Sequence, residues 1–115
     1  MAKATGIGGV FFRARDKVAL ADWYQTHLGI PGFWTQEAGM TVFAPFSQDT
    51  DYFPADKQWM INLRVDDLDG LVAALKAAGI GVETRAEWDT PETGRFARIH
   101  DPDGNQIELW EPPAE

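Results

Sequence analysis

One carboxylate near the end of the chain stands out because of its neighbours. Glu108 lies between Ile107 and Leu109 in a run typical of a strand, and alternation places it on the opposite face from these two, beside Gln106 and Trp110. A carboxylate that shares a face with a large aromatic ring can be a metal ligand, a general acid or base, an ion-pair partner or a solvated edge group. Glu108 is therefore the candidate catalytic residue, with these roles left open.

The other residue types that carry chemistry do not form a known constellation. The chain has no Cys, its single Ser is Ser47, and neither His is near that Ser in sequence, so no nucleophilic triad is indicated. The Gly-rich run at residues 6–9 precedes a predicted strand instead of linking a strand to a helix, so it is not a phosphate-binding loop.

Composition limits the class of protein. A length of 115 residues is typical of one domain, and a formal charge of −8 disfavours nucleic acid as a partner. No apolar run approaches the ~20 residues of a membrane span. The start of the chain lacks the apolar core of a signal peptide, and there is no Cys to form disulfides. We expect a cytoplasmic protein without a membrane partner.

The elements that must position Glu108 occur twice. Residues 10–16 are followed by a helix-like run at 17–28 and Gly29, and residues 61–67 are followed by a similar run at 68–78 and Gly79. Asp16 and Asp67, 51 residues apart, stand where a helix N-cap belongs, and each Gly stands where a left-handed C-terminal cap belongs. This order predicts a duplicated module.

Further strands complete each half. They are predicted at 32–37 and 40–46 in the first half, and near 81–84, at 95–100 and at 106–111 in the second. The predicted organisation is one domain over residues 1–115, with a first module at about 7–46, a linker at about 47–57 and a second module at about 58–112.

Alternation also predicts which side chains share the sheet face away from the helices. That face carries more aromatic side chains than a solvent-exposed face normally does, together with a few polar groups. This combination is the general form of a small-molecule site. Arg98 is the predicted neighbour of Glu108, because it has the same facing on the adjacent hairpin strand. Alternatively, the face packs against a partner subunit, or the linker closes it with Tyr52, Phe53 and Trp59. The predicted pocket residues are Phe11, Arg13, Thr41, Phe43, Met60, Asn62, Arg64, Phe96, Arg98, His100, Glu108 and Trp110.

A duplicated strand-helix-strands module that ends in Asp-Pro-Asp-Gly-Asn-Gln-Ile-Glu-Leu-Trp-Glu-Pro (residues 101–112) resembles the vicinal-oxygen-chelate superfamily. This superfamily includes glyoxalase I, bleomycin-resistance proteins, fosfomycin-resistance enzymes and extradiol dioxygenases. The resemblance covers nearly the whole chain. It implies an α+β fold of two tandem βαβββ modules, whose curled mixed sheet surrounds a cleft with helices on the outer face, and it implies a homodimer.

The resemblance also implies where a metal would bind. Metal enzymes of the superfamily take ligands from four sheet positions, which correspond here to Gly9, Thr41, Met60 and Glu108. Of these, Glu108 alone has the expected kind of ligand side chain, whereas a catalytic metal usually has about three protein ligands. We expect no metal cofactor. The alternative is a divalent ion held by Glu108 with His100 or with a residue of a partner chain.

These observations favour a small-molecule-binding protein without the usual metal site, which sequesters a partly aromatic or cationic compound as bleomycin-resistance proteins do. An ionised Glu108 near aromatic rings suits such a ligand. The alternative is a divalent-metal-dependent glyoxalase-like lyase, isomerase or dioxygenase that uses Glu108. A third possibility is an interaction module with no small-molecule role. Whether the chain is an enzyme is left open.

Overall fold

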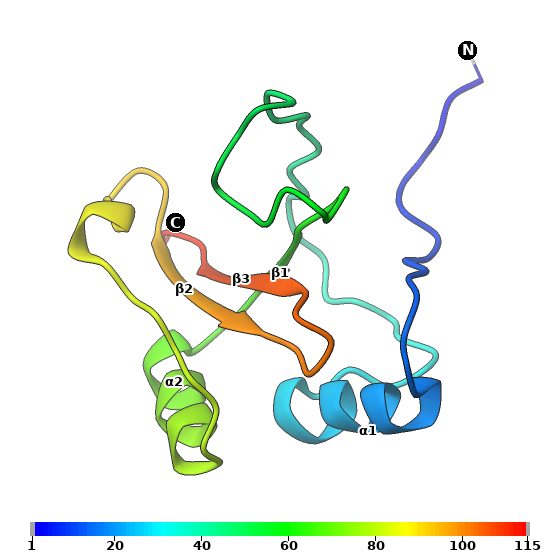
Figure 1. Ribbon diagram of the computed structural model, residues 1–115. Coiled ribbons are helices and arrows are strands. Elements are labelled where there is room, and N and C mark those ends of the chain that lie inside the picture. The colour runs from blue at the N-terminus through cyan, green and yellow to red at the C-terminus, as the bar shows by residue number, and fades with distance from the viewer. Residues whose placement is uncertain (1, 115) are drawn as a thin grey trace.

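The computed structural model describes residues 2–114 and has an α+β fold (Figure 1). Its elements, in chain order, are α1 (Lys17–Leu28), β1 (Ile61–Arg64), α2 (Leu68–Ala77), a short 3-10 helix (Ala86–Trp88), β2 (Arg95–His100) and β3 (Gln106–Glu111). No helix within residues 2–114 combines the length and the apolar character needed to cross a bilayer.

The three strands form a mixed sheet with Glu108 in its central strand. The spatial order is β1-β3-β2, in which β1 is parallel and β2 antiparallel to β3. Asn62 of β1 and Arg98 of β2 lie directly beside Glu108 on either side. An isolated antiparallel bridge joins Glu83 to Arg98. Glu108 therefore has a polar residue of each neighbouring strand next to it.

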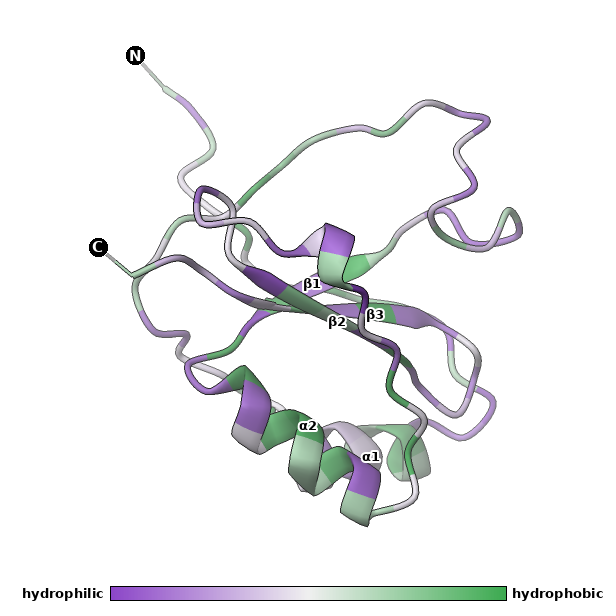
Figure 2. Cartoon of the chain, turned by 90° about the vertical axis from the view of Figure 1, so that its left-hand side faces the viewer, coloured by the Kyte–Doolittle hydropathy of each residue, from purple (hydrophilic) through white to green (hydrophobic). Residues whose placement is uncertain are grey.

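The core lies between one face of the sheet and the two helices. Figure 2 shows α1 and α2 together on the same side of the sheet. The buried residues there come from both helices and from the strand face opposite Glu108. They are Leu20, Tyr24, Leu63, Leu68, Leu75, Ala97, Ile99, Ile107 and Leu109.

The ends of both helices are set by the predicted caps. The Asp16 carboxylate accepts the amide of Ala19 at 3.1 Å, and the Asp67 carboxylate accepts the amide of Gly70 at 3.0 Å. Gly29 and Gly79 have φ values of 70° and 82°, in the left-handed region that favours glycine. The strand-cap-helix-glycine signal therefore predicted both helices correctly.

The turn between β2 and β3 holds α1 against the second half of the chain. The buried Asp101 carboxylate accepts the Tyr24 hydroxyl at 2.7 Å, the Asn105 side-chain amide at 2.8 Å and the backbone amides of Asp103 and Asn105 at 2.9 and 3.0 Å. The backbone amide and the Nε of Arg15 both donate to the Asp103 carboxylate at 3.0 Å. The closing motif thus connects the two halves.

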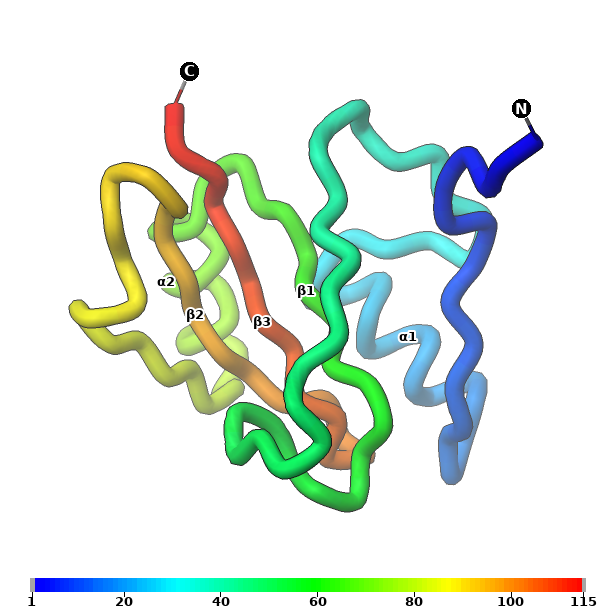
Figure 3. Tube along the Cα trace, turned by 90° about the horizontal axis from the view of Figure 1, so that it is seen from above, coloured from blue at the N-terminus to red at the C-terminus, as the bar shows by residue number. Residues whose placement is uncertain are grey.

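The first half does not form the strands predicted for residues 10–16, 32–37 and 40–46. These stretches run extended on the β1 side of the sheet (Figure 3), and among the described residues no hydrogen bond between two backbone groups joins 2–15 or 31–46 to another segment. Phe11, Phe33 and Phe43 are 95%, 101% and 76% exposed. Strands are stabilised by ladder bonds and cross-strand side-chain pairs, and these segments have neither. Residues 2–114 thus contain one sheet, that of the second predicted module, and do not form the predicted cleft between the sheets of two modules.

Candidate ligand-binding site

The Glu108 carboxylate is hydrogen-bonded on both of its oxygens. The Asn62 side-chain amide on β1 donates to Oε1 at 2.7 Å, and the Tyr52 hydroxyl donates to Oε2. Tyr52 belongs to the linker, 56 residues away in sequence. The linker is therefore attached to the central strand at the residue around which the predicted site was built.

Arg98 lies opposite Glu108 in the sheet register, as predicted, but its ion pair is formed elsewhere. Its Nη1 lies 3.5 Å from a carboxylate oxygen of Glu83. The guanidinium carbon lies 4.9 Å from the centre of the Tyr52 ring and 4.8 Å from that of the Trp88 ring. A cation close to two aromatic rings is held by attraction to the ring faces. The expected Arg98–Glu108 pair is replaced by a contact through Tyr52.

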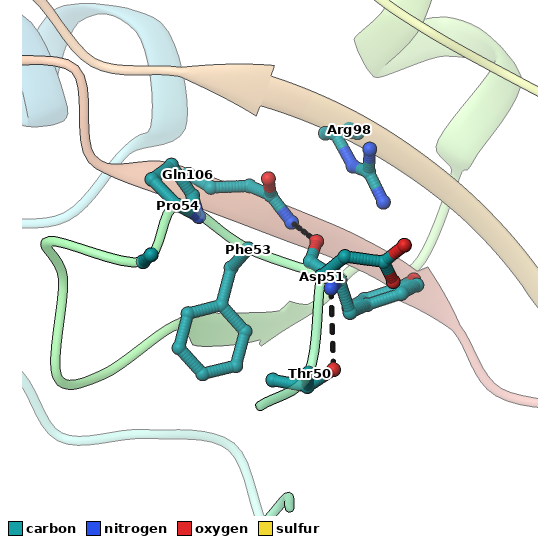
Figure 4. A pocket seen from close by; sticks show the side chains of 8 residues that line it. Thr50, Asp51, Phe53, Pro54, Arg98 and Gln106 are labelled. Carbon is teal, nitrogen blue, oxygen red and sulfur yellow. Dashed lines mark hydrogen bonds between the residues drawn. The ribbon is translucent and has the colours of Figure 1, made fainter. Parts of the chain in front are cut away.

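A pocket of about 420 Å³ lies between the linker and the sheet (Figure 4). Small-molecule sites commonly enclose roughly 300 to 1,000 Å³. The Gln106 amide donates to the backbone carbonyl of Tyr52 at 2.8 Å and lies 3.1 Å from the Met60 sulfur. The lining residues are Thr50, Asp51, Tyr52, Phe53, Pro54 and Ala55 of the linker with Arg98 and Gln106 of the sheet.

The protonation state of Tyr52 suits its role as a donor. Burial raises the pKa of the Tyr52 phenol, and the hydrogen bond to Glu108 with the charge of that carboxylate raises it further, while Arg98 acts in the opposite direction. A phenol with a raised pKa keeps its proton near neutral pH. The hydroxyl thus remains available to the Glu108 carboxylate.

The predicted site residues of the second half share one sheet face. Phe96 and Trp110 stack in parallel, with ring centres 6.3 Å apart, and the buried Trp110 indole donates to the Thr93 carbonyl at 2.7 Å. Arg64 donates to the Met40 and Glu37 carbonyls at 2.7 and 2.8 Å, while His100 is exposed at the end of β2.

Of the predicted site residues, Arg98 alone is among the described residues that line the pocket. Phe11, Arg13, Thr41 and Phe43 are exposed on the extended segments.

The linker contributes more residues to the pocket than the sequence pattern predicted. The linker was expected to be a connection, with Tyr52 and Phe53 as a possible closure of the sheet face, and both residues do line the pocket. Gln106 has the same facing as Glu108, so alternation could have included it. No local signal identifies Trp88 or Glu83, because their contacts with Arg98 depend on how residues 83–88 pass beside β2.

The side chains around Glu108 do not form a donor set for a catalytic divalent ion. Both groups bonded to its carboxylate are hydrogen-bond donors, and Gly9 and Thr41 lie on the extended first half. Within residues 2–114 there is no group of three or more His, Asp or Glu side chains placed to hold a metal. Such ions are usually held by about three nitrogen, oxygen or sulfur ligands.

The sequence profile of the family described as "Glyoxalase-like domain" matches residues 9–110. The chain belongs to this family. The predicted relation to the vicinal-oxygen-chelate superfamily is therefore confirmed, and the match spans the extended first half as well as the sheet.

Solved structures that are similar to this glyoxalase-like chain include two from Streptomyces. TnmS3, an antibiotic binding protein from Streptomyces sp. CB03234, is 28% identical over 95% of this chain and 99% of its own, with a TM-score of 0.54. A glyoxalase/bleomycin resistance protein from the same organism is 37% identical over 45% of each chain, with a TM-score of 0.34. No curated protein matches the sequence significantly.

Proposed function

We propose that the chain binds a small, partly aromatic organic molecule in the pocket between the linker and the sheet, and sequesters it without a metal ion. The observation that carries this proposal is the Arg98 guanidinium, which lines the pocket and lies close to the rings of Tyr52 and Trp88. The similarity over nearly the whole chain to TnmS3, an antibiotic binding protein, supports this class of function.

The pocket has the mixture of surfaces that such a ligand requires. Phe53, Pro54 and Ala55 supply apolar surface, and Arg98 and Gln106 supply hydrogen-bond donors. Asp51 lines the same pocket, and the chain carries a formal charge of −8, so a neutral or cationic compound is favoured over an anion.

The bonding of Glu108 supports binding over catalysis. Its two oxygens already accept from Tyr52 and Asn62, which hold the carboxylate in place next to a residue that lines the pocket, Tyr52. A general base needs an oxygen within hydrogen-bond reach of a substrate proton. In this arrangement Tyr52 occupies that position at Oε2.

Thermal melting of chelator-treated protein with a panel of aromatic antibiotics that includes bleomycin tests the proposal. Compounds that bind the native state raise the melting temperature. We expect several to do so for the wild type, and the shift to disappear in Arg98→Ala. The matched control is Arg85→Ala, because Arg85 also pairs with Glu83 and lies over Trp88 but does not line this pocket.

Two outcomes would contradict the proposal. One is an upward shift that survives in Arg98→Ala. The other is a shift that requires added divalent ions and is lost in Glu108→Ala, which would favour a metal-dependent enzyme.

We also infer that the chain forms a homodimer and that the first module forms its strands in that assembly. The exposed apolar side chains of the extended first half support this, because contiguous apolar surface is rarely left uncovered. They include Val10, Phe11, Phe12, Phe33, Met40, Val42 and Phe43. Sedimentation at micromolar concentration tests the predicted homodimer. We expect the wild type to be a dimer and the double variant Phe11→Ser/Phe43→Ser to shift towards monomer. A monomeric wild type would contradict the inference.

A further inference from the structure

Among the described residues, one linker residue, Tyr52, makes the hydrogen bonds between the linker and the sheet, through its side chain and its backbone carbonyl. Two hydrogen bonds join residues 47–57 to the sheet within residues 2–114, and both involve Tyr52: its hydroxyl donates to Glu108, and its backbone carbonyl accepts from the Gln106 side chain. The other hydrogen bonds of the linker are local, such as the Thr50 amide to the Ser47 carbonyl at 3.0 Å and the Lys57 amide to the Pro54 carbonyl at 3.0 Å. Release of Tyr52 would therefore break both hydrogen bonds between the linker and the strands.

Tyr52 makes the contacts that a hydroxyaromatic molecule would make at this place. Its hydroxyl donates to the Glu108 carboxylate, and its ring lies 4.9 Å from the Arg98 guanidinium carbon. Asn62 fixes Glu108 from the other side, and Trp88 fixes Arg98, so the acceptor and the cation are held in place by residues outside the linker. The sheet thus presents a prepared acceptor and a flat cation to one aromatic ring.

We propose that Tyr52 is a built-in occupant of the ligand site, which a neutral hydroxyaromatic compound displaces when it binds. The inference rests on the proposed function of this pocket and adds the ligand class and a self-inhibiting contact. The adjacent pocket of about 420 Å³ gives a fused-ring compound room to extend beyond the position of a single phenol ring.

The charge of the site selects the neutral form of such a compound. Glu108 is an acceptor, so it binds a protonated hydroxyl and repels a phenolate. The same environment raises the pKa of the Tyr52 phenol, with burial as the largest cause and Glu108 next. A bound phenol is subject to the same influence, which disfavours its ionisation.

Calorimetric titration with 2-naphthol and with 2-methoxynaphthalene tests the inference. The two probes share the same ring system, but only the naphthol can donate to Glu108. A competing internal group lowers the apparent affinity in proportion to the fraction of molecules in which the site is free. Tyr52→Ala should therefore bind 2-naphthol more tightly than the wild type by more than about tenfold. The methoxy compound should bind more weakly than the naphthol, and Glu108→Gln should reduce that difference.

Phe53→Ala is the matched control. Phe53 lies next to Tyr52 and lines the same pocket, yet no hydrogen bond joins it to the sheet among the described residues. Its removal takes apolar surface out of the pocket without releasing Tyr52, so it should weaken naphthol binding. Tyr52→Phe, which keeps the ring and loses the hydroxyl, should bind 2-naphthol more tightly than the wild type but less tightly than Tyr52→Ala.

The outcomes separate this inference from the proposed function. Equal or weaker naphthol binding by Tyr52→Ala, or equal binding of the two probes, would overturn the displacement model and leave the pocket as a binding site. The displacement model would also be overturned, and the pocket kept as a binding site, if 2-naphthol binds no variant while antibiotics of the panel bind to the wild type and not to Arg98→Ala. Failure of every compound with every folded variant would overturn both proposals.

Discussion

Arg98 and Glu108 are direct cross-strand neighbours, yet the contact between these two charges runs through a third side chain. The Tyr52 ring lies against the Arg98 guanidinium, and the Tyr52 hydroxyl donates to Glu108. Arg98 directs its ion pair to Glu83 instead. The strand pair is thus arranged around an aromatic ring that comes from the linker.

Tyr52→Phe should loosen the linker without unfolding the chain. A hydrogen bond to a charged group contributes roughly 1.5 to 3 kcal/mol, so its loss should raise the population of the undocked linker about tenfold or more. Trypsin cleavage after Lys57, which tracks the open population when opening is fast, measures this. Phe53→Leu serves as the control. Equal cleavage rates for Tyr52→Phe and wild type would show that the hydroxyl does not hold the linker.

Asp101→Asn should be among the most destabilising single substitutions. The buried carboxylate accepts four hydrogen bonds, and Asn offers one acceptor oxygen with an NH2 group that would face donors. We expect a loss of roughly 3 kcal/mol in the free energy of unfolding, measured by urea denaturation. Asn105→Ala, which removes one of the four donors, should have a smaller effect. A loss below that of Asn105→Ala would contradict the role of Asp101 as the centre of the turn.

Tyr24 should make the protein sensitive to alkali. Burial raises the pKa of the Tyr24 phenol, and the hydrogen bond to Asp101 raises it further. A pKa raised in the folded state gives stability that is fully present below the unfolded value near 10 and is lost as the pH rises towards the folded value. The difference in unfolding free energy between wild type and Tyr24→Phe should therefore shrink above pH 10. A constant difference from pH 7 to 11 would exclude this linkage.

Asp103 should contribute to the free energy of unfolding at neutral pH and lose this contribution in acid. The backbone amide and then the guanidinium of Arg15 lower the pKa of the Asp103 carboxyl. A lowered carboxyl pKa gives stability that is present above the unfolded value near 4 and is lost as the pH falls through the folded value. Urea denaturation of wild type and Asp103→Asn at pH 6 and pH 3 should show a difference that shrinks at the lower pH. A difference that grows on acidification would contradict the Arg15 pairing.

The sequence predicted the parts of the fold that depend on local signals. Asp16 and Asp67 cap helices because their carboxylates reach amides three residues on, and Gly29 ends a helix because it tolerates a positive φ. Alternation placed Ile99 and Ile107 in the core because a strand with one covered face has a period of two. These relationships span a few residues and need no knowledge of the partner segments.

The parts that were missed depend on contacts between distant segments. Alternation predicted on which face of the sheet Arg98 lies, but it did not predict its ion-pair partner. That partner, Glu83, lies beside Arg98 through an isolated bridge outside the named strands. Tyr52 meets Glu108 across 56 residues of sequence, which no local pattern encodes. The strands of the first half were expected from alternation around Phe11 and Phe43, yet a strand also requires a partner with which to pair.

The most direct test of metal-independent ligand binding is the backbone amide NMR spectrum of chelator-treated protein, recorded with and without the most stabilising compound of the antibiotic panel. We expect shifts concentrated at the non-proline residues of 50–55, at Arg98 and Gln106 and at the Trp88 indole, with α1 and α2 unaffected. Shifts that appear only after a divalent ion is added, or that lie on the helices and leave residues 50–55 unchanged, would contradict it.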